Sequence, residues 1–125
     1  MDLIIGGAYQ GKRAYAKEKF MLTDEDTFTC TETGEIDFGA SCIDRVEEFT
    51  MWCVKHGVDA VDWFQSHRDE WESGVLICRD IFCGVVPMGA EMRAWREMTG
   101  RLCAYLAGEA EHVTRIYCGL EQKLK

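Results

Sequence analysis

The sequence contains no long apolar run, no excess of positive charge and no closely spaced pair of cysteines. Its uncharged stretches are far shorter than the roughly 18 to 20 apolar residues that span a bilayer, so no membrane-spanning segment is expected. The 14 Lys and Arg against 22 Asp and Glu give a net charge of -8. Because a sequence-independent grip on nucleic acid needs a basic surface, no nucleic-acid partner is expected, and an anionic ligand must be held by a local group of cations.

The cysteines and histidines do not follow a disulfide or metal-binding pattern. The seven cysteines are odd in number and lack a CxxC pair, and most lie in apolar runs, where a reduced thiol packs as a small hydrophobe. The three histidines are scattered, whereas zinc ligands come in tight pairs. The first residues, Met1-Asp2 and a three-residue apolar run, do not resemble a signal peptide, so we expect a cytoplasmic protein.

Strand and helix patterns alternate along the 125 residues, which suit one domain with a substantial core. Short apolar runs predict buried strands at residues 2–5, 75–78 and 113–118, and helical spacing of apolar residues predicts a helix over 12–21. Such alternation is typical of an α/β fold with a mostly parallel sheet flanked by helices. Ligands then bind at the carboxyl ends of the strands.

The remaining segments give less regular patterns. Residues 23–42 predict a small strand or hairpin, with alternating stretches at 27–30 and 35–38, that ends in a loop. Residues 43–71 predict two consecutive helices separated at Gly57. The longest helix is expected to start at Pro87 and to bury one face, and residues 121–125 form a short charged tail. The members of that face are Met88, Met92, Trp95, Thr99, Leu102 and Leu106.

The most specific motif lies between the first strand and the first helix. Residues 6–12 fit the first seven positions of GxxxxGK[ST], the phosphate-binding P-loop. Glycines let successive backbone N–H groups surround an anion, the helix N-terminus adds partial positive charge, and Lys12 reaches the outer phosphates. We therefore predict a single P-loop nucleotide-binding domain over 1–125, with Lys12 catalytic and ATP or GTP as ligand. The predicted binding residues are Gly6, Gly7, Ala8, Tyr9, Gln10, Gly11, Lys12 and Arg13.

Arg13 departs from that motif, which has a Ser or Thr hydroxyl for Mg²⁺ at this position. A guanidinium has no acceptor atom and is no ligand for a cation. One interpretation is that the charge of Arg13 replaces part of the charge that Mg²⁺ supplies. The other is that Arg13 turns outward and pairs with an acidic neighbour such as Glu18 or Asp80.

Three later segments carry a resemblance to a known family. Residues 75–87 read VLICRDIFCGVVP, residues 93–101 read RAWREMTGR and residues 118–125 read CGLEQKLK. Together with residues 2–16, they resemble the adenosylcobinamide kinase and adenosylcobinamide-phosphate guanylyltransferase family. In that family a strand runs into Asn-Glu-Val-Gly and then Gly-Ile/Val-Val-Pro, followed by an Arg-x-Phe-Arg-Asp-x-x-Gly-Arg helix and a terminal Gly-x-x-x-Lys-hydrophobe-Lys.

The resemblance implies a three-layer P-loop NTPase-like fold and phosphoryl transfer from ATP or GTP to the aminopropanol hydroxyl of adenosylcobinamide, a corrinoid. It also implies a homo-oligomer, a trimer. Asp80 stands where the family has Glu, which implies a catalytic and Mg²⁺-binding carboxylate, and an ion pair with Arg79 or Arg13 is the alternative. Arg93, Arg96 and Arg101 are expected on a solvated helix face, with a phosphate contact for one of them as the alternative.

The family's His-Arg-x-x-x-Pro segment, whose histidine accepts GMP, has no counterpart in residues 21–73. The pair His67-Arg68 is expected at a helix end, so guanylyltransferase activity is not expected. The competing hypothesis is a catalytically silent nucleotide-binding or anion-binding regulatory protein. A third is a scaffold whose loop holds a structural anion.

Overall fold

The computed structural model describes residues 1–125 and contains one six-stranded sheet with the strand order β2-β3-β4-β1-β5-β6. All neighbouring strands are parallel except β5 and β6, which are antiparallel. This confirms the α/β class and the mostly parallel sheet. The strands are β1 (Asp2–Gly6), β2 (Thr27–Thr29), β3 (Cys42–Asp44), β4 (Val75–Arg79), β5 (His112–Tyr117) and β6 (Leu120–Lys123).

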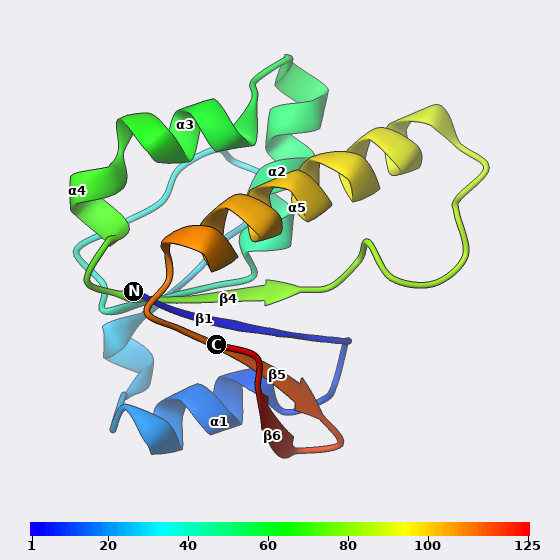
Figure 1. Cartoon of the computed structure of the whole chain (residues 1–125). Coiled ribbons are helices and arrows are strands. Elements are labelled where there is room, and N and C mark those ends of the chain that lie inside the picture. The colour runs from blue at the N-terminus through cyan, green and yellow to red at the C-terminus, as the bar shows by residue number, and fades with distance from the viewer.

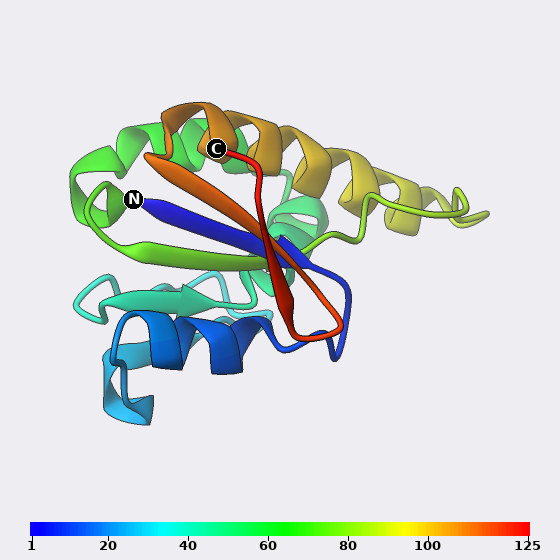
Figure 2. The ribbon, with the colours of Figure 1, turned by 60° about the horizontal axis from the view of Figure 1, so that its bottom comes forward.

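Helices cover both faces of the sheet (Figure 1). One face carries α2 (Val46–His56), α3 (Ala60–Ser66), α4 (Arg68–Trp71) and α5 (Ala90–Glu109), and the other carries α1 (Lys12–Lys19) with the short 3-10 helix η1 (Asp24–Asp26). Figure 2 shows the sheet edge-on between these two groups of helices. None of the helices combines the length and the apolarity needed to cross a bilayer.

The strands are apolar on both faces because each face packs against helices. In β1, Leu3 belongs to the larger core under α2, α3 and α5, and Ile4 belongs to the smaller core under α1. In β4, Leu76 belongs to the larger core and Ile77 to the smaller one. This explains why the sequence shows short continuous apolar runs rather than alternation.

The helices that follow β3 begin and end at identifiable residues. Gly57 lies in the left-handed region with φ 66° and ends α2, as predicted. The Asp59 side chain accepts hydrogen bonds from the backbone N–H groups of Val61 and Asp62, which fixes the start of α3. His67 separates α3 from α4, so the expected second helix is two short helices.

Several sequence expectations about element bounds are wrong. The predicted small strand is present as β2, but residues 35–38 form no strand, and β2 pairs in parallel with β3, so there is no hairpin. Ile43 lies in β3, and the helix begins only at Val46. The tail forms strand β6, because its residues pair with the edge strand β5.

The longest helix begins at Ala90, so Pro87 belongs to the preceding loop. Met88 is 95% exposed and Met92 41% exposed, and neither belongs to the core that was expected to include them. The other four members of the predicted face, Trp95, Thr99, Leu102 and Leu106, are buried. The loop between β4 and α5 extends away from the body of the molecule, and Met92 belongs to the first turn of the helix that follows this loop (Figures 1 and 2).

Candidate functional site

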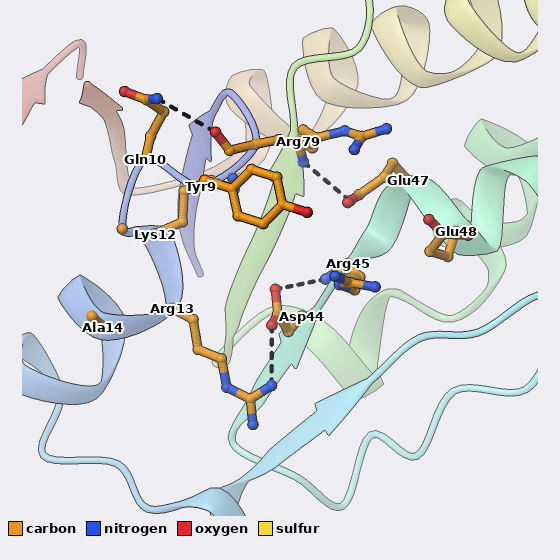
Figure 3. Close-up of a pocket in the computed structure, with 12 residues that line it drawn as sticks. Tyr9, Gln10, Lys12, Arg13, Ala14, Asp44, Arg45, Glu47, Glu48 and Arg79 are labelled. Atoms are coloured by element: carbon orange, nitrogen blue, oxygen red, sulfur yellow. Dashed lines mark hydrogen bonds and ion pairs between the residues drawn. The ribbon is translucent and has the colours of Figure 1, made fainter. Parts of the chain in front are cut away.

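A cavity of about 290 Å³ lies at the carboxyl ends of β1, β3 and β4. It is bounded by the glycine-rich loop between β1 and α1, by the first turn of α1, by the junction of β3 and α2, and by the end of β4 (Figure 3). Four of its lining residues are basic and three are acidic, although the whole chain has a net charge of -8. The lining residues are Ala8, Tyr9, Gln10, Gly11, Lys12, Arg13, Ala14, Asp44, Arg45, Glu47, Glu48 and Arg79.

Backbone donors are concentrated at the loop. The N–H groups of residues 7–14 donate no hydrogen bond to another group of the protein. Four of these donors are the ordinary free N–H groups at the start of a helix, and the other four belong to the loop that precedes it. Such a series of donors at a helix N-terminus is suited to binding an anion with several oxygens.

Glycines make this loop conformation accessible. Gly11 adopts φ 95° at the start of α1, a conformation that side chains with a Cβ atom rarely adopt. A Cβ atom on Gly6 would lie 2.5 Å from the backbone oxygen of Ile116 in β5. The first glycine therefore permits close packing against the neighbouring strand, and the second permits the turn into the helix.

Lys12 occupies the first position of α1 and lines the cavity. Its Nζ donates a hydrogen bond to the Gly7 carbonyl oxygen at 2.5 Å, so the side chain folds back over the loop. Partial burial lowers the pKa of Lys12, and the carboxylates of Glu47, Asp44 and Asp80 oppose this shift. Three acidic groups around one ammonium indicate that the positive charge is retained at the loop.

Arg13 extends from α1 toward the end of β3, away from the loop (Figure 3). Its guanidinium lies 3.5 Å from Asp44 Oδ2 and 3.2 Å from Asp24 Oδ1, and it donates a hydrogen bond to Thr29 Oγ1. The prediction of an acidic partner is correct in kind, but Glu18 and Asp80 are not the partners. The pairing with Asp44 depends on β3 lying next to β4, which the sequence did not indicate.

Glu47, in the first turn of α2, is a buried carboxylate at the cavity wall. Burial raises the pKa of Glu47, while a hydrogen bond from the Arg79 backbone N–H at 3.1 Å opposes that shift. The Glu47 carbonyl oxygen accepts a hydrogen bond from Trp95 Nε1 at 2.7 Å. The helix that carries this carboxylate is thus anchored to both β4 and α5.

Arg45 and Arg79 add two further cations to the cavity. Arg45 adopts φ 57° between β3 and α2, a left-handed conformation that is uncommon for residues other than glycine. Asp44 Oδ1 accepts a hydrogen bond from the Arg45 backbone N–H at 2.8 Å, which stabilises this turn. The Arg79 guanidinium lies over the Trp95 ring, with 5.8 Å between Cζ and the ring centroid.

Asp80 lies beside the glycine-rich loop, at the end of β4. Its backbone N–H donates to the Gly6 carbonyl oxygen, and its Oδ1 would be 3.9 Å from a Cβ atom on Gly7. It forms no ion pair with Arg79 or Arg13 and does not line the cavity. Its roles in catalysis and metal binding stay predictions.

The sequence did not predict six of the lining residues as site residues: Ala14, Asp44, Arg45, Glu47, Glu48 and Arg79. One signal was present for Asp44, because the short apolar run Cys42-Ile43 is followed by an aspartate, and the apolar run at 75–78 is followed by Arg79 and Asp80. The helical spacing that begins at Val46 obscured this three-residue strand.

The other basic and imidazole side chains that the sequence singled out lie outside the cavity. Arg96 holds the loop before α5, with hydrogen bonds to the carbonyl oxygens of Phe82 and Gly84, and Arg101 pairs with Asp59. Arg93 donates to the Met88 carbonyl oxygen. His67 lies between α3 and α4, before the start of β4, and therefore at the opposite end of the parallel strands from the loop (Figure 1).

The donor set does not fit a resident divalent cation. No three His, Cys, Asp or Glu side chains form a group that could hold a metal ion. Position 13 supplies a guanidinium in place of a hydroxyl, and this guanidinium lies against Asp44, the most buried aspartate at the cavity. A second cation at Asp44 would therefore face a positive charge already in place.

The chain matches no protein-family model, and no curated protein matches it.

Proposed function

We propose that this protein binds the phosphate chain of ATP or GTP in the cavity and transfers the terminal phosphoryl group to an acceptor hydroxyl. The observation that carries this proposal is the series of free backbone N–H groups at residues 7–14, next to the Lys12 ammonium. Phosphate oxygens accept hydrogen bonds from such donors, and the helix N-terminus favours their negative charge. The P-loop NTPase-like identity of the fold is part of this proposal.

The size of the cavity agrees with this ligand. A volume of about 290 Å³ accommodates the phosphate chain, and the nucleoside then lies outside it toward solvent. Tyr9, at the tip of the loop, is fully exposed and is available for contact with the nucleoside.

In the proposed reaction, the acceptor hydroxyl oxygen bonds to the γ-phosphorus while the bond from that phosphorus to the β,γ-bridging oxygen breaks. The backbone N–H groups and Lys12 stabilise the charge on the phosphate oxygens. Glu47 lines the cavity and is the proposed acceptor of the hydroxyl proton, and burial raises the pKa of its carboxyl group. The diphosphate nucleotide and the phosphorylated acceptor are the products.

We propose adenosylcobinamide as the acceptor on the resemblance of residues 75–87, 93–101 and 118–125. The first two of these segments form β4, the exposed loop after it and the first half of α5. This loop follows directly from the cavity wall at Arg79 and exposes Val85, Val86 and Met88. An apolar, solvent-facing segment that starts at the cavity wall is suited to contact with a large acceptor such as a corrinoid.

Nucleotide turnover tests the activity. The protein is incubated with ATP or GTP, with and without adenosylcobinamide, and both the diphosphate nucleotide and the phosphorylated corrinoid are quantified. A kinase forms both products in equal amounts, only with the corrinoid present. Nucleotide binding without turnover in both samples would instead support the silent regulatory protein, the alternative that Arg13 favours.

A further inference from the structure

We infer that this protein binds its nucleotide without a divalent cation, because the Arg13 guanidinium occupies the place beside Asp44 that a metal ion would take. The inference rests on the proposed nucleotide site and states which positive charge completes it.

Arg13 is fixed by groups from three elements. Its two terminal nitrogens lie 3.2 Å from Asp24 Oδ1 in η1, 3.2 Å from Thr29 Oγ1 at the end of β2, and 3.5 Å from Asp44 Oδ2 at the end of β3. A guanidinium that is held by several partners is preorganised. Its position at the cavity is therefore set before any ligand binds.

Asp44 is engaged through both oxygens. Oδ2 lies against Arg13, and Oδ1 accepts a hydrogen bond from the Arg45 backbone N–H at 2.8 Å. The Asp44 side chain is only 10% exposed, whereas the Arg13 side chain is 41% exposed, so solvent reaches the pair from the side of Arg13. A divalent cation at this carboxylate would have to displace Arg13 from its partners.

The cavity already supplies fixed cations in place of the metal. Arg13 and Lys12 are consecutive residues and both line it, and Arg45 and Arg79 line the opposite wall. A nucleoside triphosphate that enters without a metal ion meets the free N–H groups of the loop and four basic side chains against three acidic ones, so the lining keeps an excess of positive charge. These charges perform the charge compensation that Mg²⁺ performs in a site with a hydroxyl at position 13.

Titration calorimetry with ATP and with GTP, each in EDTA and in Mg²⁺, tests the inference on the wild-type chain. We expect dissociation constants that agree within about threefold between the two buffers. Binding that is at least tenfold tighter in Mg²⁺ overturns the inference and leaves the proposed function intact. Absence of nucleotide binding in both buffers overturns the inference and the proposed function together.

Substitution of Arg13 should make nucleotide binding depend on Mg²⁺. Arg13→Ser supplies a hydroxyl and releases Asp44, so nucleotide binding in EDTA should weaken at least tenfold and recover in Mg²⁺. The double variant Arg13→Ser/Asp44→Asn should lose that recovery. Lys17→Ser is the matched control, because Lys17 lies on the same helix and pairs with the same Asp24 but does not line the cavity, so it should keep wild-type behaviour.

Binding of Mn²⁺ alone, followed by electron paramagnetic resonance, adds a readout that needs no nucleotide. We expect no Mn²⁺ bound to the wild type, and a site in Arg13→Ser that Asp44→Asn removes. Stoichiometric Mn²⁺ binding by the wild type overturns the inference. If Asp80→Asn abolishes that binding, the metal belongs to Asp80, as the family resemblance implies.

Discussion

Removal of the Lys12 ammonium is the most direct perturbation of the proposed phosphate site. In the variant Lys12→Ala, the backbone donors of residues 7–14 remain, and the charge closest to them is lost. The substitution also deletes the hydrogen bond to the Gly7 carbonyl oxygen, which is an exchangeable contact at the surface of the loop. The variant should fold, since Lys12 belongs to neither core.

The magnitude follows from the kind of contact that is lost. A hydrogen bond to a charged group contributes about 1.5 to 3 kcal/mol, and about 1.4 kcal/mol corresponds to a factor of ten in affinity. Because Lys12 is partly buried, water screens its charge less than it screens a surface lysine. We therefore expect the dissociation constant for ATP or GTP to increase about 10- to 150-fold.

Titration calorimetry on both proteins measures this change, and Lys17→Ala serves as the control. Lys17 is on the same helix but outside the cavity, so its removal should alter the affinity by less than about twofold. Equal affinities of wild type and Lys12→Ala would refute the placement of phosphate at this loop. Equal losses in the two variants would show that only the overall charge of the helix matters.

Three further predictions concern stability and a side activity. Glu47→Gln should make the protein more stable than wild type at neutral pH, because the wild-type protein loses free energy of unfolding as the pH rises through the raised pKa of Glu47. In urea unfolding the difference should vanish at acid pH, and a pH-independent difference would contradict this. Phe64→Ala should lower the free energy of unfolding by about 3 to 5 kcal/mol, because the ring is fully buried among Phe49, Trp63 and Trp71. A loss below about 1 kcal/mol in urea unfolding would be inconsistent with that packing. Labelled GTP with Mg²⁺ should leave no acid-labile label on the chain, since His67 lies at the far end of the strands, and a label lost in His67→Ala would contradict this.

The sequence predicted those parts of the fold whose signals are local. The apolar runs of β1 and β4 are bounded by glycine or charge, and each is too short for a helix. Gly57 ends α2 because a left-handed residue is required there. By contrast, β3 has only three residues, and β6 depends on pairing with β5, so neither has a pattern of its own.

Met88 and Met92 show a different limit of sequence patterns. Their helical spacing continues that of the buried residues Trp95 and Leu102, but the loop before α5 leads the start of the helix beyond the sheet. Periodicity identifies a face of a helix and does not show how far the partner surface extends. The buried part of the face ends where the sheet ends.

The candidate site also has one part that a local motif predicts and another part that depends on the arrangement of the strands. The loop and Lys12 form a contiguous motif, so their proximity follows from covalent connection. Asp44 and Glu47 reach the cavity because β3 is the second strand from β1, with β4 between them, and strand order is not encoded in any short segment. Arg13 connects the two parts: its pairing with Asp44 requires both the helix that follows β1 and the strand two places away. A substitution at position 13 therefore acts on a carboxylate 31 positions further along the chain. The effect that we infer for this residue on metal binding follows from the order of the strands in the sheet and not from the loop motif.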